Sequence, residues 1–170
     1  MGQFVLGTPT GLISRIDNPI TLANSTTETT LLSTMIAGSA MTLKNRLKFN
    51  LWCALSTQAL VPGTLTIRVK YGSLVLTLGG GALALLGSAA SAPFTMSGRL
   101  SNKGTTNSQF CYGELRQASG GLSLLSPINQ ARSTSAIDST TDQAFSITAQ
   151  FSVASAQNIL VVDDIEVELS

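Results

Sequence analysis

Residues 45–55, NRLKFNLWCAL, and residues 64–71, TLTIRVKY, decide the fold. After Asn45, every second residue in both stretches is apolar, and the residues between them are polar except for Trp52 and Ala54. Successive side chains of a β-strand point to opposite faces, so this alternation predicts strands with one buried and one solvated face. Strands of parallel sheets are apolar on both faces, whereas half-buried strands are typical of antiparallel sheets. The two stretches therefore predict an antiparallel all-β protein.

The same alternation recurs along the rest of the chain, and no stretch favours a helix. Turn-forming residues such as Pro62 and Gly63 separate the alternating stretches. Residues 120–142, which include Pro127, lack the pattern and are predicted to form a long connection. The further predicted strands are 29–36, 74–78, 94–100, 108–116, 143–151 and 158–169.

The last predicted strand contains one residue that breaks its pattern. Asp163 falls on the inward phase, which indicates a β-bulge, a strand end or a buried partner at this position. The alternation is expected to direct Asp164, Glu166 and Glu168 outward. It is expected to bury the apolar residues of this strand, which are Ile159, Val161, Ile165, Val167 and Leu169.

Eight antiparallel strands in two sheets predict a jelly-roll sandwich over residues 28–170. Residues 1–27 contain glycines and prolines without a sustained period, so we expect an irregular N-terminal arm extended along a neighbouring molecule. With the eight strands lettered B to I, a jelly roll orders its sheets B-I-D-G and C-H-E-F. This order places Arg68 and Lys70 beside the outward carboxylates of the last strand.

The composition excludes several classes of function. The 170 residues include no histidine, so no Ser–His or Cys–His catalytic pair and no His-ligated metal site exists. A formal net charge of +1 lacks the basic excess of a protein that binds nucleic acid by neutralising phosphates. Hydrophobic residues make up 44% of the chain, which excludes a disordered protein. We expect no enzymatic activity, no cofactor or metal, and no nucleic-acid partner.

The two cysteines, Cys53 and Cys111, belong to no CxxC motif. Both lie in apolar, strand-like stretches, where a free cysteine behaves as a small buried hydrophobic residue. The predicted strand order also places them near opposite ends of the sandwich, beyond the ~7 Å Cα separation that a disulfide spans. We therefore expect two free thiols.

Residues 71–98 carry no charge over a length that could span a bilayer. Glycines at 79–81 and Pro93 interrupt the stretch, and its apolar density is too uneven for a spanning helix. We expect a strand, a neutral loop and another strand, and no membrane partner.

Four apolar residues are candidates for contacts with another subunit. Leu83, Leu85 and Leu86 lie in the neutral loop, which would be unfavourable in water unless a partner covers it. Trp52 points away from the apolar face of its own strand. Tryptophan is enriched at interfaces, but its own chain can cover this residue as well, and the sequence leaves both alternatives open.

Three stretches resemble a recurring jelly-roll module of tailed-bacteriophage virion proteins. They are TTETTLLSTMIAG at 26–38, LTIRVKYG at 65–72 and, near the C-terminus, SAIDSTTDQAFSITAQFSVASAQNILVVDDIEVEL. The resemblance covers roughly Leu22 to Leu169. It implies a structural virion protein, of the kind seen as capsid decoration (cement) proteins and as head or tail fibre domains, commonly assembled as trimers. It provides no active-site residues.

Two roles follow from this resemblance. As a cement protein, the chain would bind the major capsid protein on the outer surface of a phage head, as a homotrimer assembled in the host cytoplasm. As a fibre or adhesin module, it would bind a host surface glycan. The sequence begins at Met1 and places only a short arm before the sandwich, so we expect the cement role, with an arm that is ordered only in the assembled particle.

Overall fold

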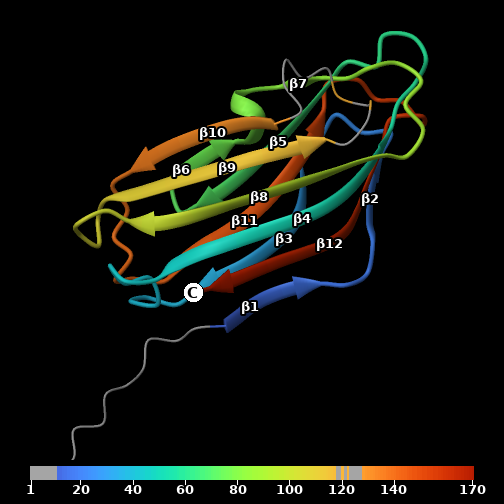
Figure 1. The fold of residues 1–170 in the computed structure, drawn as a ribbon. Helices are drawn as coiled ribbons and strands as arrows, with labels where there is room; N and C mark the ends of the chain where they lie inside the picture. The colour runs from blue at the N-terminus through green and yellow to red at the C-terminus, as the bar shows by residue number, and fades with distance from the viewer. Residues whose placement is uncertain (1–10, 118–119, 121, 123–127) are drawn as a thin grey trace, which may run out of the picture.

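Twelve strands form two antiparallel sheets in the computed structural model, which describes residues 11–117, 120, 122 and 128–170 (Figure 1). A 3-10 turn, η1 (Leu78–Gly80), follows β6. The strands are β1 (Gly11–Ile16), β2 (Ile20–Ala23), β3 (Thr29–Ile36), β4 (Arg46–Ser56), β5 (Thr64–Tyr71), β6 (Leu74–Thr77), β7 (Leu83–Ala84), β8 (Ala92–Asn102), β9 (Gln109–Gln117), β10 (Ile128–Ser135), β11 (Gln143–Phe151) and β12 (Ile159–Leu169).

The two sheets enclose one apolar core. Sheet A has the order β1-β12-β4-β8-β9-β10, and β2 pairs with the first half of β12 on the edge that β1 also occupies. Sheet B has the order β3-β11-β5-β6, with β7 paired to β5. All of these pairs are antiparallel, as the alternating sequence pattern predicts.

The strand order confirms the jelly-roll fold. When β1 and β2 together are lettered B, and β3, β4, β5, β6, β8, β11 and β12 are lettered C to I, sheet A contains B-I-D-G and sheet B is C-H-E-F. Strands β9 and β10 extend sheet A beyond strand G. The sandwich is therefore a jelly roll enlarged by two strands on one sheet.

The prediction of an irregular N-terminal arm is wrong for the part of the arm that the structure describes. Residues 11–16 and 20–23 form strand B, and Leu22 is 5% exposed. Arg15 also bonds across to Asp164 of β12, at 3.4 Å from Nη2 to Oδ2. Residues 1–10, the remainder of the expected arm, lie outside the described residues. Because this first strand was missed, the letters of the five predicted strands from 29–36 to 94–100 were each shifted by one, and the strand predicted as G is the additional strand β9.

The predicted contact of Arg68 and Lys70 with the last strand is wrong for the same reason. Both residues lie on β5 in sheet B, where they bind Glu28. The Lys70 Nζ is 2.7 Å from Glu28 Oε1, and the Arg68 Nη1 is 3.5 Å from Oε2. The neighbours of β12 are β1 and β2 on one side and β4 on the other, and β4 places Lys48 directly opposite Glu168.

Two further predictions about strands need correction. The expected connection 120–142 contains β10, which pairs with β9 along its whole length. In β12, the register shifts between Val162 and Asp164, so a β-bulge, one of the three alternatives expected for Asp163, is present. The bulge reverses which residues face the core in the part of β12 that precedes Asp163. Leu160 and Val162 are therefore buried, whereas Ile159 and Val161, which were expected inside, are half-buried.

Close packing under sheet A leaves no room for side chains at two glycines. Gly98 and Gly113 are paired across β8 and β9, and Phe49 is paired with Gly98 from β4. A Cβ atom on Gly98 would collide with the Phe49 ring, and one on Gly113 would collide with Leu78. The large side chains that point into the core from neighbouring strands therefore leave room only for glycine at these two positions.

Both cysteines are buried and free, as predicted. The reason differs from the expected one, because both lie in sheet A. Cys53 on β4 pairs with Phe94, whereas Cys111 on β9 pairs with Leu100, so β8 separates them and they lie at different heights along the sheet. Residues 71–98 form strands and a turn, and among the described residues no helix is long and apolar enough to cross a bilayer.

Candidate functional site

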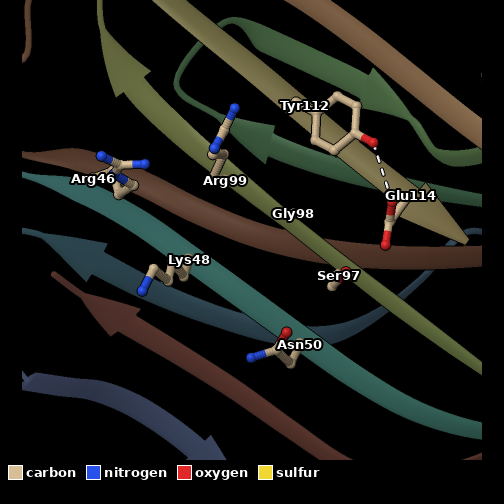
Figure 2. A pocket seen from close by; sticks show the side chains of 8 residues that line it. All are labelled: Arg46, Lys48, Asn50, Ser97, Gly98, Arg99, Tyr112 and Glu114. Carbon is tan, nitrogen blue, oxygen red and sulfur yellow. Dashed lines mark hydrogen bonds between the residues drawn. The ribbon is translucent and has the colours of Figure 1, made fainter.

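An open depression of about 410 Å³ lies on the outer face of sheet A (Figure 2). Three neighbouring strands line it with polar side chains: β4, β8 and β9. The alternation of each strand turns these side chains outward while their sequence neighbours fill the core. The lining residues of this first depression are Arg46, Lys48, Asn50, Ser97, Gly98, Arg99, Tyr112 and Glu114.

Three cations surround the first depression. Lys48 and Arg99 are directly opposite each other across β4 and β8, and Arg46 precedes Lys48 on the same face of β4. Like charges in directly opposed positions destabilise a sheet. In the described part of the chain none of the three forms a salt bridge, since the salt bridges there involve the other cations Arg15, Arg68, Lys70 and Arg116. The site therefore has positive charge available for a ligand.

The carboxylate of the first depression is already neutralised by its own strand. Arg116 Nε lies 2.6 Å from Glu114 Oε1, and the Tyr112 hydroxyl donates to Oε2 at 3.1 Å. The hydrogen bond from Arg116 is the main cause that lowers the pKa of Glu114, and burial is the main cause that raises the pKa of Tyr112. Figure 2 shows Arg99 between Arg46 and Tyr112. The Arg99 guanidinium carbon is 5.9 Å from the Tyr112 ring centroid, a cation–π distance.

The structure separates the four apolar residues expected at an interface. Leu83 is 4% exposed and Leu85 is 7% exposed, so their own core covers them and the expectation of an uncovered loop is wrong at these two positions. Leu86 remains exposed. Trp52 is 41% exposed on the outer face of sheet A, with Asp164 and Thr95 opposite it on the neighbouring strands.

A second distinct surface is formed by three loops without a charged residue, 57–63, 85–91 and 152–158. Hydrogen bonds join them at one end of the sandwich: Thr57 donates to Leu86, and Asn158 donates to Pro62. We name these loops the charge-free end. The side chains of Leu60 and Val61 at its tip are 80% and 79% exposed.

Sequence reasoning missed the depression although part of its signal was present. The outward phase of β4 identifies Arg46 and Lys48 as exposed cations. The phase of β9 was not evident, because its inward positions include Gly113 and the polar residue Gln109. Tyr112 could therefore not be placed beside Arg99. Among the described residues, no group of three His, Cys, Asp or Glu side chains is placed to hold a metal ion.

No protein-family model and no curated protein matches the sequence. Several solved structures are similar in shape. One is lectin I from Ulex europaeus in complex with the methyl glycoside of α-L-fucose (TM-score 0.40, 8% identity, 74% of this chain and 72% of that chain). Another is the CBM2 module of the evolved Dit of Lactobacillus casei BL23 phage J-1 (TM-score 0.37, 10% identity, 80% and 67%). With scores this low, the fold assignment rests on strand pairing and the site on its own residues.

Proposed function

We propose that this chain is a non-enzymatic binding module that holds an acidic carbohydrate in the first depression. The observation that carries the proposal is the group of Arg46, Lys48 and Arg99 around one open hollow, without a salt bridge in the described part of the chain. A bound anion would offset the repulsion between the opposed Lys48 and Arg99. Arginine suits this task, because its guanidinium donates two parallel hydrogen bonds to a carboxylate or sulfate.

The other lining groups suit a sugar. Asn50 and Ser97 offer an amide and a hydroxyl that can donate to and accept from ligand hydroxyls. The Tyr112 ring, which has Arg99 over one face, adds an aromatic group beside them. A few convergent polar groups beside an aromatic ring are typical of ligand sites that fix orientation. The hollow is open, which suits a polymer that continues beyond it.

A binding role without catalysis fits the state of Glu114. Glycoside hydrolysis uses two carboxyl groups, one of them a general acid with a raised pKa. Glu114 is the one carboxyl group lining the first depression, and its pKa is lowered by the hydrogen bond from Arg116. Glu114 is therefore ionised at neutral pH, and both of its oxygens already accept hydrogen bonds from Arg116 and Tyr112. This state suits a residue that positions Tyr112 better than one that donates a proton.

Isothermal titration with three probes tests the proposal: a heparin-derived octasaccharide, a hyaluronan octasaccharide and a neutral isomaltose-type octasaccharide. We expect at least one acidic probe to bind and the neutral one to bind at least tenfold more weakly. Arg99→Ser should weaken acidic binding at least tenfold. Arg68→Ser, which removes the same charge from sheet B, should leave it unchanged. Equal binding of acidic and neutral probes, or no binding at all, would overturn the proposal.

Capsid decoration is the second candidate function, and the charge-free end favours it. Leu60 and Val61 are exposed to water although the loop that carries them is fixed in place. Val61 also has a φ of 50°, which is unusual for a β-branched residue and marks a strained position. Exposed apolar side chains on a strained, fixed loop suit a surface that a partner covers.

Three backbone carbonyls of the charge-free end already accept hydrogen bonds from this chain, so burial by a partner would not leave these three unpaired. The carbonyl of Val61 accepts from the Gln58 side chain at 2.6 Å, and that of Pro62 accepts from Asn158 at 2.9 Å. The Gln58 carbonyl accepts from the Ser88 amide at 3.1 Å. Since these acceptors are satisfied internally, their removal from water costs little. In this candidate role the partner is the major capsid protein, on the outside of a phage head, with the chain as a homotrimer.

Particle binding tests the second candidate. Purified heads that lack this protein would be incubated with the wild-type chain or with Leu60→Ser/Val61→Ser, and bound protein would be measured after sedimentation. We expect the double variant to lose binding while its thermal midpoint stays unchanged, because both side chains are exposed. A Leu12→Ser variant controls for loss of an exposed leucine elsewhere. Equal binding of the double variant and the wild type would exclude attachment through this end.

A further inference from the structure

A second depression, of about 390 Å³, adjoins the first along the strands of sheet A. Arg46 and Arg99 line both hollows and so form their shared wall. Lys44 and Lys103 add two cations at the far side of the second depression, and no carboxylate is among its lining residues. Lys103 also lies over the Phe110 ring, with its Nζ 4.5 Å from the centroid. This hollow is therefore more uniformly cationic than the first.

A buried hydrogen-bond network holds the floor of the second depression. The Asn102 amide donates to the Met41 carbonyl and to Ser139 Oγ, each at 2.9 Å. The Asn102 oxygen accepts from Gln109 Nε2 at 2.9 Å, and Gln109 Oε1 accepts from the Ile137 amide at 2.7 Å. Asn102 is 8% exposed and Gln109 is 1% exposed. A satisfied buried network of this kind fixes the loops that carry the cations.

The two depressions together form one cationic track. Its cations are Lys44, Arg46, Lys48, Arg99 and Lys103, five of the ten in the chain. Lys103 follows Ser97 by six residues along β8 and its adjoining turn, so the track is about 20 Å long at ~3.3 Å per residue. A ligand confined to the first depression would leave Lys44 and Lys103 without a partner.

We infer that the ligand is an acidic polysaccharide that runs along β4 and β8 and places a second negatively charged group in the second depression. This inference rests on the proposed function of the first depression. The fixed floor presents the second group of cations at a set distance from the first, so engagement of one end raises the effective concentration of the other end. Affinity should therefore rise steeply once the acidic chain is long enough to reach both hollows.

The aromatic rings favour a polysaccharide over single-stranded nucleic acid. Base stacking requires an open ring face. Arg99 lies against the Tyr112 ring and Lys103 against the Phe110 ring, so each ring has a face already occupied by a cation. These cations present N–H donors toward the ligand instead, which suits carboxylate or sulfate groups on a sugar chain.

Isothermal titration of the full-length chain with heparin-derived oligosaccharides tests the inference. The probes are a disaccharide, which is shorter than the track, and an octasaccharide, which is longer. The wild type should bind the octasaccharide at least tenfold more tightly than the disaccharide. Lys44→Ser/Lys103→Ser should remove most of this difference while leaving disaccharide affinity within twofold. Arg68→Ser/Lys70→Ser, which removes two cations from sheet B, should preserve the difference.

Each outcome decides one point. If the octasaccharide binds and the Lys44/Lys103 variant binds it as tightly as the wild type, the second depression is not a subsite, whereas the proposed function stands. If neither oligosaccharide binds above a neutral octasaccharide, the proposed function fails, and the inference fails with it. If a twelve-nucleotide oligo(dT) binds at least tenfold more tightly than the octasaccharide and loses affinity in the same double variant, the track is a nucleic-acid site, and the polysaccharide inference fails.

Discussion

Asn158 is fully buried, and its amide joins the loops of the charge-free end. Its Oδ1 accepts from the Gln58 amide at 3.1 Å, while its Nδ2 donates to the Pro62 carbonyl at 2.9 Å. One side chain thus satisfies a donor at the start of the 57–63 loop and an acceptor near its end. The neutral Asn158 amide therefore holds the loop on both sides of Leu60 and Val61.

Asn158→Ala should lower the free energy of unfolding by about 1–3 kcal/mol, because it removes a fully buried amide and leaves the part-buried Gln58 amide and Pro62 carbonyl without these partners. Urea denaturation at neutral pH measures this loss. The neighbouring exposed residue provides the control, and Gln157→Ala should change stability by no more than about 0.5 kcal/mol. A loss for Asn158→Ala as small as the control would show that water readily replaces the amide.

Cys53 and Cys111 should be inert in the folded protein. Burial raises the pKa of the Cys53 thiol far above its usual range and that of Cys111 to about 12. The reactive species is the thiolate, so neither residue supplies an appreciable amount at pH 8. Titration with a thiol reagent at pH 8 should detect no fast-reacting thiol before denaturation and two after it. Fast reaction of the native protein at either site would contradict the burial of both strands.

Strands with a regular apolar alternation were predictable, and the strands at the sheet edges were not. β3, β4, β5, β8, β11 and β12 follow the pattern of their residues, since each buries one face in the core. β1 and β2 are short edge strands on which Leu22 is the fully buried residue, so their sequence carries almost no alternation. β10 reads INQARSTS and is recruited by pairing with β9 rather than by its own pattern. Edge strands depend on their neighbours more than on their own sequence.

Deletion of strand B should expose the edge of β12 and destabilise the fold. Removal of residues 1–10 should leave the thermal midpoint nearly unchanged, since β1 and β2 keep their pairing with β12. Removal of residues 1–24 should give an aggregating or unfolded chain, because it opens an unpaired edge and uncovers the site of Leu22. In the full chain, Leu22→Ala should cost about 2–3 kcal/mol. Equal thermal midpoints for the two truncated chains would show that residues 11–24 do not stabilise the fold and act as a loose arm.

The outer face of sheet B contains an ion cluster with a defined acid response. Glu28 binds Lys70 and Arg68, and the hydrogen bond from Lys70 is the main cause that lowers its pKa. A carboxyl group with a lowered folded-state pKa stabilises the protein fully above its unfolded pKa of about 4.3, and this contribution disappears as the pH falls through the folded value. Glu28→Gln should therefore lower stability at pH 7 and flatten its decline below about pH 4.5. Glu166→Gln, with no salt bridge to lose in the described part of the chain, is the matched control in acid titrations followed by thermal melts. If Glu28→Gln loses stability in acid to the same extent as the wild type, protonation of Glu28 does not contribute to the acid response.

At the scale of the whole molecule, the few charges are unevenly distributed. The track on sheet A gathers five of the ten cations, whereas three loops at the opposite end of β4 carry none. The sequence shows which segments carry cations and which carry no charge, but where these segments lie in the molecule depends on the jelly-roll strand order. Because the first strand was missed, Arg68 and Lys70 were assigned to the sheet of the last strand, and Arg46 and Lys48 to the other sheet, which is the reverse of the observed arrangement. Missing this one edge strand therefore placed the wrong pair of cations on the sheet of the last strand.

Salt should separate ligand binding from folding. Stability rests on the continuous apolar core between the sheets, so the thermal midpoint of the free protein should change little between about 0.1 M and 1 M sodium chloride. Binding at the track depends on exposed charges, and the screening length falls from about 10 Å to about 3 Å over this range. A saturating acidic octasaccharide at a hundred times its Kd adds about 2.7 kcal/mol of stability at low salt. Thermal melts should show this gain shrinking by at least half at 1 M. An increase in midpoint that survives 1 M salt would mean that apolar contacts, rather than Arg46, Lys48 and Arg99, hold the ligand.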